Sequence, residues 1–122
     1  MEEFDIAIIG GGPAGIMAAI AASADLNIVL LEKNSSLGSK LLITGGGRCN
    51  ITNEKPIKKL LNSFHDKNFL KHSFYTFTNE MLLDLFRNRG LDFIVEDNNR
   101  VFPETEKSQD ILSVSYTHLR AH

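Results

Sequence analysis

A glycine-rich motif close to the amino terminus constrains the fold of this chain more than any other feature. An apolar run, Ile-Ala-Ile-Ile, occupies positions 6–9. Three glycines spaced G-x-G-x-x-G follow it directly: Gly10, Gly12 and Gly15. Phosphate groups bind at a helix N-terminus when no side chains cover the backbone N–H groups. The sequence therefore predicts a strand, a tight turn and a helix that together hold the diphosphate of a dinucleotide.

Pro13 and Ala14 complete the predicted phosphate-binding turn. Proline suits the first turn of a helix because its missing N–H has no partner to lose there. Residues 16–22 are small or apolar on every side, which predicts a helix that is largely buried. The near-continuous apolar run 4–9 predicts a buried parallel strand in front of it.

An acidic residue follows the next predicted strand, which spans residues 27–31. Glu32 lies 20 positions beyond Gly12, where a carboxylate accepts hydrogen bonds from ribose hydroxyl groups. A carboxylate in this place repels a 2′-phosphate, which disfavours NADP and leaves NAD and the adenosine of FAD open. The competing interpretation of Glu32 is a solvated strand end.

A second glycine cluster, Gly45 to Gly47, lies further along the chain. Three consecutive glycines stabilise neither a helix nor a strand, because each loses maximal backbone entropy on ordering. Arg48 offers a planar fork of donors suited to phosphate or an electron-rich ring, and Asn50 can both donate and accept. The cluster is therefore either a flexible surface loop or a segment whose exposed backbone packs against a flat or charged ligand.

Two segments resemble a known family. Residues 40–53, Lys-Leu-Leu-Ile-Thr-Gly-Gly-Gly-Arg-Cys-Asn-Ile-Thr-Asn, look like the signature of the BaiN-like flavoproteins, also described as aminoacetone-oxidase-like FAD-binding enzymes. Residues 100–112 are similar to the family's segment after its first β-hairpin. The resemblance covers residues 1–112 and implies a flavoprotein related to the fumarate reductase and aspartate oxidase group.

The resemblance also implies roles for particular residues. Gly10 to Gly15 would hold the diphosphate of non-covalently bound FAD, and Glu32 the adenosine ribose. Lys33 and Lys40 would approach the adenine or phosphate region. The residues implied to run along the flavin and its ribityl chain are Thr44, Gly45, Gly46, Gly47, Arg48, Cys49 and Asn50.

The predicted fold class is α/β: a Rossmann-like FAD-binding βαβ unit, partial and truncated, with a helical and β-hairpin insertion. We expect residues 1–112 to be the N-terminal part of an FAD/NAD(P)-binding domain in a larger enzyme. Residues 113–122 depart from the family's pattern, and we expect them to be a non-native, artefactual tail.

The middle of the chain predicts short helices, a longer helix and a hairpin. Short helical pieces are expected over 56–61 and 68–77, and a helix over 79–88 with Thr78 as its N-cap. A strand over 91–95, a polar turn and a return strand over 100–102 follow. The aromatic residues of this region are expected to pack in the core, with a cavity wall as the alternative: Phe64, Phe69, Phe74, Phe77 and Phe86.

Cys49 is the only cysteine, which excludes an intrachain disulfide. Its neighbour Arg48 could activate the thiol, but a small buried residue in a tight cofactor loop is the favoured interpretation. No residue is assigned as a catalytic acid or base, and no metal site is expected.

The overall composition is that of a globular domain, with 43% hydrophobic and 23% charged residues and a net charge of −2. We expect a cytoplasmic FAD-dependent oxidoreductase acting on a small organic substrate, with no membrane or nucleic-acid partner. Reduced nicotinamide, NAD(P)H, or oxygen is the candidate second redox partner, and the fragment alone is expected to be inactive. The alternatives are an NAD-binding dehydrogenase fragment and a non-catalytic FAD-binding or sensing protein.

Overall fold

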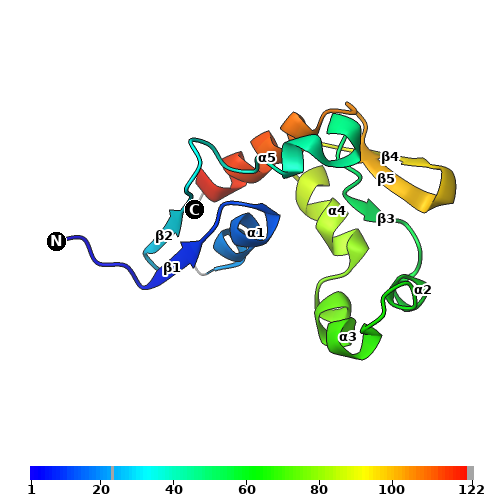
Figure 1. The fold of residues 1–122 in the computed structure, drawn as a ribbon, viewed down its shortest axis with the longest axis horizontal. Helices are drawn as coiled ribbons and strands as arrows, with labels where there is room; N and C mark the ends of the chain where they lie inside the picture. Colours follow the sequence, from blue (N-terminus) through cyan, green and yellow to red (C-terminus); the bar gives the residue numbers. More distant parts are fainter. Residues whose placement is uncertain (23, 121–122) are drawn as a thin grey trace.

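A computed structural model describes residues 1–22 and 24–120, which form two small sheets connected by helices (Figure 1). The first sheet consists of the parallel strands β1 (Ile6–Ile9) and β2 (Ile28–Leu31). The second has the strand order β3-β5-β4, all antiparallel, with β3 (Thr52–Asn53), β4 (Phe93–Glu96) and β5 (Arg100–Pro103). The mixed α/β fold class predicted from the sequence is confirmed.

The first sheet and helix α1 (Pro13–Ala21) form the predicted βαβ unit. The register pairs Ile6 with Ile28 and Ile9 with Leu31, so both strands end at the same edge, beside the glycine turn. The strand is less buried than expected, because α1 covers one face of the sheet and Ile9 points away from it with 79% of its surface exposed. The helix likewise buries one face rather than its whole surface; the buried residues are Ile16, Ala19 and Ile20.

Gly15 sets the distance between α1 and β1. A Cβ atom at this position would lie 1.9 Å from the carbonyl oxygen of Gly10 and 3.4 Å from Cγ2 of Ile8. No side chain larger than hydrogen fits, so the helix rests directly on the end of the strand. Gly10 itself has a φ of +102°, a left-handed conformation that favours glycine, as the tight turn out of β1 requires.

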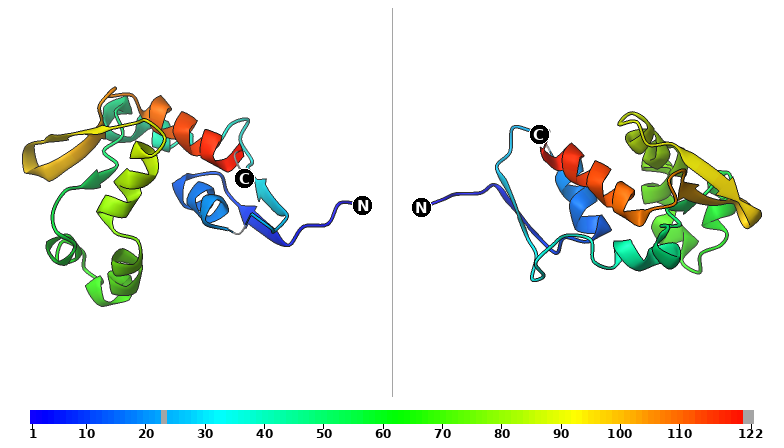
Figure 2. Two further views of the ribbon diagram at one scale, coloured as in Figure 1. Left: turned by 180° about the vertical axis from the view of Figure 1, so that it is seen from behind. Right: turned by 90° about the horizontal axis from the view of Figure 1, so that it is seen from above.

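Helix α5 (Ser108–Arg120) joins the βαβ unit to the rest of the chain, as two further views show (Figure 2). Its Leu112 packs with Ile16 and Ile20 of α1, while the preceding Ile111 packs with Cys49 and Phe86. Successive helical residues point about 100° apart, so one turn of α5 serves two hydrophobic clusters. The Ser108 hydroxyl also donates to the carbonyl oxygen of Leu42 at 2.7 Å, which ties the start of α5 to the 3₁₀ segment η1 (Leu41–Gly47).

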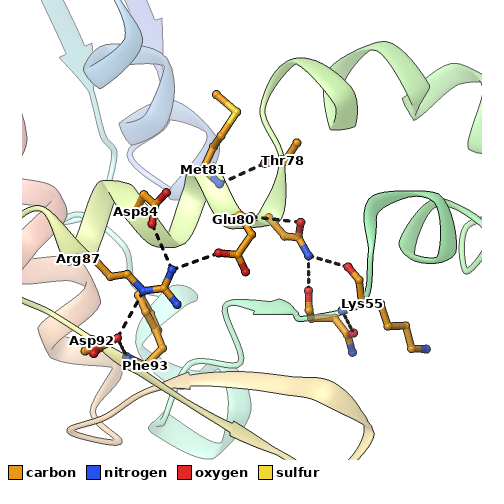
Figure 3. Close-up of polar contacts among 10 residues, drawn as sticks. Lys55, Thr78, Glu80, Met81, Asp84, Arg87, Asp92 and Phe93 are labelled. Carbon is orange, nitrogen blue, oxygen red and sulfur yellow. Dashed lines mark hydrogen bonds and ion pairs between the residues drawn. The ribbon is translucent and has the colours of Figure 1, made fainter.

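Helix α4 (Asn79–Arg87) carries the predicted N-cap: the Thr78 hydroxyl accepts the Met81 N–H at 3.2 Å (Figure 3). Leu83 and Phe86 are its most buried apolar residues, whereas Met81 is exposed. Arg87, in the last turn, forms ion pairs with Glu80, Asp84 and Asp92.

The hairpin β4–β5 turns through η2 (Asp97–Asn99), close to the predicted positions. Strand β3 was not expected, because two polar residues carry no recognisable alternation. The buried Asn79 side chain holds the chain after β3 by donating to the carbonyl oxygens of Asn53 at 2.7 Å and Lys55 at 2.9 Å.

The short helices α2 (Ile57–Leu61) and α3 (Lys67–Thr76) lie at the end of α4 away from α5 (Figures 1 and 2). Both were predicted within one or two residues. The expectation that the aromatic residues pack in the core holds for Phe86 and is wrong for three others. Phe64, Phe69 and Phe77 are exposed, because α2 and α3 pack mainly on each other and little on the other elements.

Helix α5 continues across residue 113, the boundary of the expected non-native tail. Residues 113–120 are helical, and residues 121–122 lie outside the described part of the chain. The origin of residues 113–122 stays a prediction.

The two glycines of the turn provide a test of this packing. Gly15→Ala should destabilise the full-length protein by at least about 3 kcal/mol, because its Cβ overlaps a backbone oxygen. Gly12→Ala is the matched control: its Cβ meets no atom within 4 Å, and its φ of −81° is allowed for alanine. It should cost about 1 kcal/mol or less. Urea unfolding measures both, and equal losses would contradict the assigned role of Gly15.

Candidate functional site

The turn before α1 presents bare backbone to solvent. Gly12 is the N-cap residue, no side chain caps the helix, and the first turn holds no acidic residue. Nothing lies within 4 Å of the Cβ position of Gly12, whereas the same position at Gly15 is filled by the strand. The N-terminal N–H groups of α1 are therefore accessible to an anion, as the motif predicts.

Glu32 is bonded to this turn. Its Oε1 accepts the Gly11 N–H at 2.9 Å and its Oε2 accepts the Asn34 N–H at 2.7 Å. Both hydrogen bonds lower the pKa of the Glu32 carboxyl group, and the bond from Asn34 has the larger effect. The sequence interpretation of a solvated strand end is therefore incomplete: the carboxylate is ionised, fixed, and placed beside the glycine turn.

Gly11 was not among the predicted site residues, because the motif leaves its position free. A Cβ atom there would lie 2.3 Å from Cδ2 of Leu37 and 3.3 Å from Oε1 of Glu32. Its carbonyl oxygen also accepts the Gly38 N–H at 2.9 Å. Gly11 thus holds the turn against the chain after β2, and the unbroken run of three glycines was the signal for it.

Lys33 and Lys40 are exposed on the segment that follows β2. Lys33 lies beside Glu32 and contributes to lowering its pKa. The predicted approach of both lysines to adenine or phosphate stays a prediction.

The second glycine cluster has an irregular backbone, as predicted. Gly45, Gly46 and Gly47 have φ values of +56°, +67° and +90°, and Thr44 before them is extended. A Cβ at Gly45 would lie 2.7 Å from the backbone nitrogen of Asn50, while the Cβ position of Gly46 is open. The loop therefore packs on one side and exposes its backbone on the other.

Arg48 fastens this loop to the β4–β5 hairpin. Its guanidinium group forms ion pairs with Glu96 and, at 2.6 Å, with Glu106, and it stacks on the ring of Phe102 at 4.0 Å. The hydrogen bond with Glu96 raises the pKa of Arg48 and lowers that of Glu96. In this arrangement Nη1 and Nη2 of Arg48 are engaged by carboxylates, whereas its buried Nε has no hydrogen-bond partner among the described residues. A direct ligand contact of Arg48 stays a prediction.

Cys49 is a buried core residue, as favoured from the sequence. It is 2% exposed, and burial raises the pKa of its thiol, which argues against a reactive thiolate. Its φ of +61° belongs to the same left-handed segment as the glycines before it.

A pocket of about 240 Å³ brings the two glycine regions together. Pro13 of the first turn lines it from one side, and Thr44, Cys49 and Asn50 line it from the other. The remaining walls are mostly apolar and come from α1, α4 and α5, together with Leu41 of η1 and Ile51. An apolar hollow with few polar groups beside the glycine turn suits a planar ring system.

Within residues 1–22 and 24–120, no three His, Cys, Asp or Glu side chains lie close enough to hold a metal ion. The helices of the same part of the chain include none long and apolar enough to cross a bilayer.

The βαβ unit, the open glycine turn and the fixed carboxylate define a Rossmann-type nucleotide-binding domain. A family model described as "HI0933-like protein Rossmann domain" matches residues 4–122. The chain belongs to this family, which confirms the resemblance to the BaiN-like flavoproteins.

Curated relatives agree with this assignment. The chain is 34% identical over 118 residues to 3-dehydro-bile acid delta(4,6)-reductase of Clostridium scindens, covering 94% of this chain and 28% of the relative. It is 33% identical over 112 residues to the ribosomal RNA dihydrouridine synthase of Escherichia coli, covering 89% and 27%. A shorter match, 39% over 74 residues, covers 60% of the chain and 13% of the mitochondrial dihydrolipoyl dehydrogenase of Caenorhabditis elegans. The chain thus spans little more than a quarter of the first two relatives.

The bonds of Glu32 predict a pH-dependent stability. Folding lowers the pKa of this carboxyl group, so its contribution is complete above the pKa of the unfolded chain and is lost as pH falls through the folded value. Glu32→Gln should lower stability at pH 7 and flatten the loss between about pH 5 and pH 3. Urea midpoints across this range measure the effect. Glu2→Gln is the control with the same charge change, and parallel profiles for the two variants would rule out this role.

The burial of Cys49 predicts a structural effect without loss of cofactor. Cys49→Ser places a hydroxyl in an apolar core and should cost about 1 to 3 kcal/mol, while bound FAD is retained. Visible absorbance of the purified variant measures the flavin, and Cys49→Ala is the control for size. A folded serine variant without flavin would show that the thiol contributes to the site.

Proposed function

We propose that this chain is the FAD-binding part of a flavin-dependent oxidoreductase that acts on a small organic substrate. The observation that carries the proposal is the accessible backbone at Gly12 next to the fixed carboxylate of Glu32. Family membership and relatives named as a reductase and a dehydrogenase support it.

The residues present fit the diphosphate and ribose of FAD. The α1 N-terminus offers backbone N–H groups and a positive helix-dipole end to the diphosphate. The Glu32 carboxylate uses part of its acceptor capacity for Gly11 and Asn34 and keeps lone pairs for a ribose hydroxyl.

The pocket between the glycine regions suits the ring end of the cofactor. Its apolar walls exclude water, and Thr44 and Asn50 can orient polar edges. Bound FAD supplies the hydride or electron transfer, and the chain positions it. Reduced nicotinamide or oxygen is the second redox partner in this proposal. No residue of this chain is assigned to contact with the substrate.

Two other functions remain as alternatives. The βαβ unit by itself suits an NAD-binding dehydrogenase equally well, but the irregular glycine segment after β2 favours FAD, because a dehydrogenase normally continues with another strand–helix unit. A protein that holds FAD without turnover would show the same geometry. Negligible turnover of the full-length flavoprotein with a wide panel of reductants and acceptors would favour that alternative.

The full-length protein should purify yellow, and its visible absorbance should be lost on unfolding and ultrafiltration. Calorimetry of the cofactor-free protein should show tighter binding of FAD than of NAD. Gly12→Ala should weaken FAD binding about 10- to 100-fold, the equivalent of a lost hydrogen bond to a charged group, with little change in stability. A colourless protein that FAD does not reconstitute would refute the proposal.

A further inference from the structure

The α2–α3 region has a charge opposite to that of the chain as a whole. Residues 55–77 contain five lysines and one acidic residue, Asp66, a net charge of +4. The complete chain has a net charge of −2, so the other residues together carry −6. The low net charge that argued against a nucleic-acid partner is therefore an average over two unlike regions.

Three of these lysines surround one groove. Lys58 of α2 and Lys67 and Lys71 of α3 line a hollow of about 180 Å³ between the two helices. A second, shallow hollow along α3 adjoins it and shares Asn68, Lys71 and Tyr75 with the first. No acidic residue lines either hollow, so the lysine charges converge on a place that suits an anion.

Aromatic and amide side chains accompany the lysines. Tyr75, which is 51% exposed, lines both hollows, and Phe69 on the same helix is 84% exposed. Asn62 and Asn68 add amide groups to the lining of the first hollow. Cations that follow a backbone, an aromatic face for stacking and amides for base edges are the combination that binds single-stranded nucleic acid.

We propose that this lysine groove, formed by Lys58, Lys67, Lys71 and Tyr75, binds single-stranded nucleic acid. The lysines contact phosphates, and the Tyr75 ring stacks on a base. A bilayer fits the groove less well, because Leu70 and Phe74 of α3 are half-buried and leave Phe69 and Tyr75 as the large apolar side chains that this helix exposes. A hollow between two helices also receives a strand better than a flat surface.

The proposal is independent of flavin binding. Helices α2 and α3 lie at the far end of α4 from α5, away from α1 and the glycine turn (Figures 1 and 2). None of the residues that line the groove lines the pocket between the glycine regions. A colourless protein would refute the flavin proposal and leave this one standing.

The test measures binding of fluorescein-labelled 20-nucleotide oligouridylate and oligothymidylate to the full-length protein across a range of salt concentrations. Lys67→Gln/Lys71→Gln should weaken binding about tenfold near 150 mM salt and make the slope of log K against log salt shallower by about 1.4. Arg89→Gln/Lys107→Gln removes the same charge elsewhere and should change both quantities much less. Tyr75→Ala should weaken binding at least about fivefold, while Tyr75→Phe retains it.

Labelling of surface lysines with an acetylating reagent gives a second readout. Lys58, Lys67 and Lys71 should react in the free protein and be protected by the oligonucleotide. Preferential binding of the uridylate or of the thymidylate identifies RNA or DNA as the source of the strand. Equal losses in the two double variants, unreactive groove lysines in the free protein, or binding only to phosphatidylserine-containing vesicles would overturn the proposal.

Discussion

The close approach of Gly15 to the carbonyl oxygen of Gly10 is the constraint on which the geometry of the candidate site depends. It lets α1 begin at the end of β1, so that the first N–H groups of the helix open beside the carboxyl ends of both strands. Glu32 then reaches the turn from β2 and binds the Gly11 N–H. A larger residue at position 15 would move the helix away from the strand and separate the glycine turn from the carboxylate of Glu32.

The second half of the site depends on contacts between segments far apart in the sequence. Arg48 is paired with Glu96 and Glu106, 48 and 58 positions away, and these bonds hold the glycine loop on the hairpin. Helix α5 packs against both clusters and joins the loop to α1. The pocket between the glycine regions exists because these long-range contacts bring Pro13 and Thr44 to the same space.

Local sequence patterns were sufficient to predict those features that depend on a residue and its immediate neighbours alone. The turn at the glycine motif, the acid after β2 and the Thr78 cap each follow from neighbouring residues. The burial of Cys49 also followed from the small volume and apolar nature of its side chain. The exposed aromatics of α2 and α3 could not be predicted in the same way, because exposure depends on which other elements cover a helix.

The sequence by itself determined the βαβ unit, its glycine turn and the place of the acidic residue, because strand periodicity, glycine conformation and helix termini are local properties. Only the tertiary structure decided that Gly11 and Glu32 are bonded, that Nη1 and Nη2 of Arg48 are engaged by carboxylates, and that lysines from two helices face one groove. Those outcomes depend on distances between segments that no single window of sequence contains, since packing rather than propensity sets them.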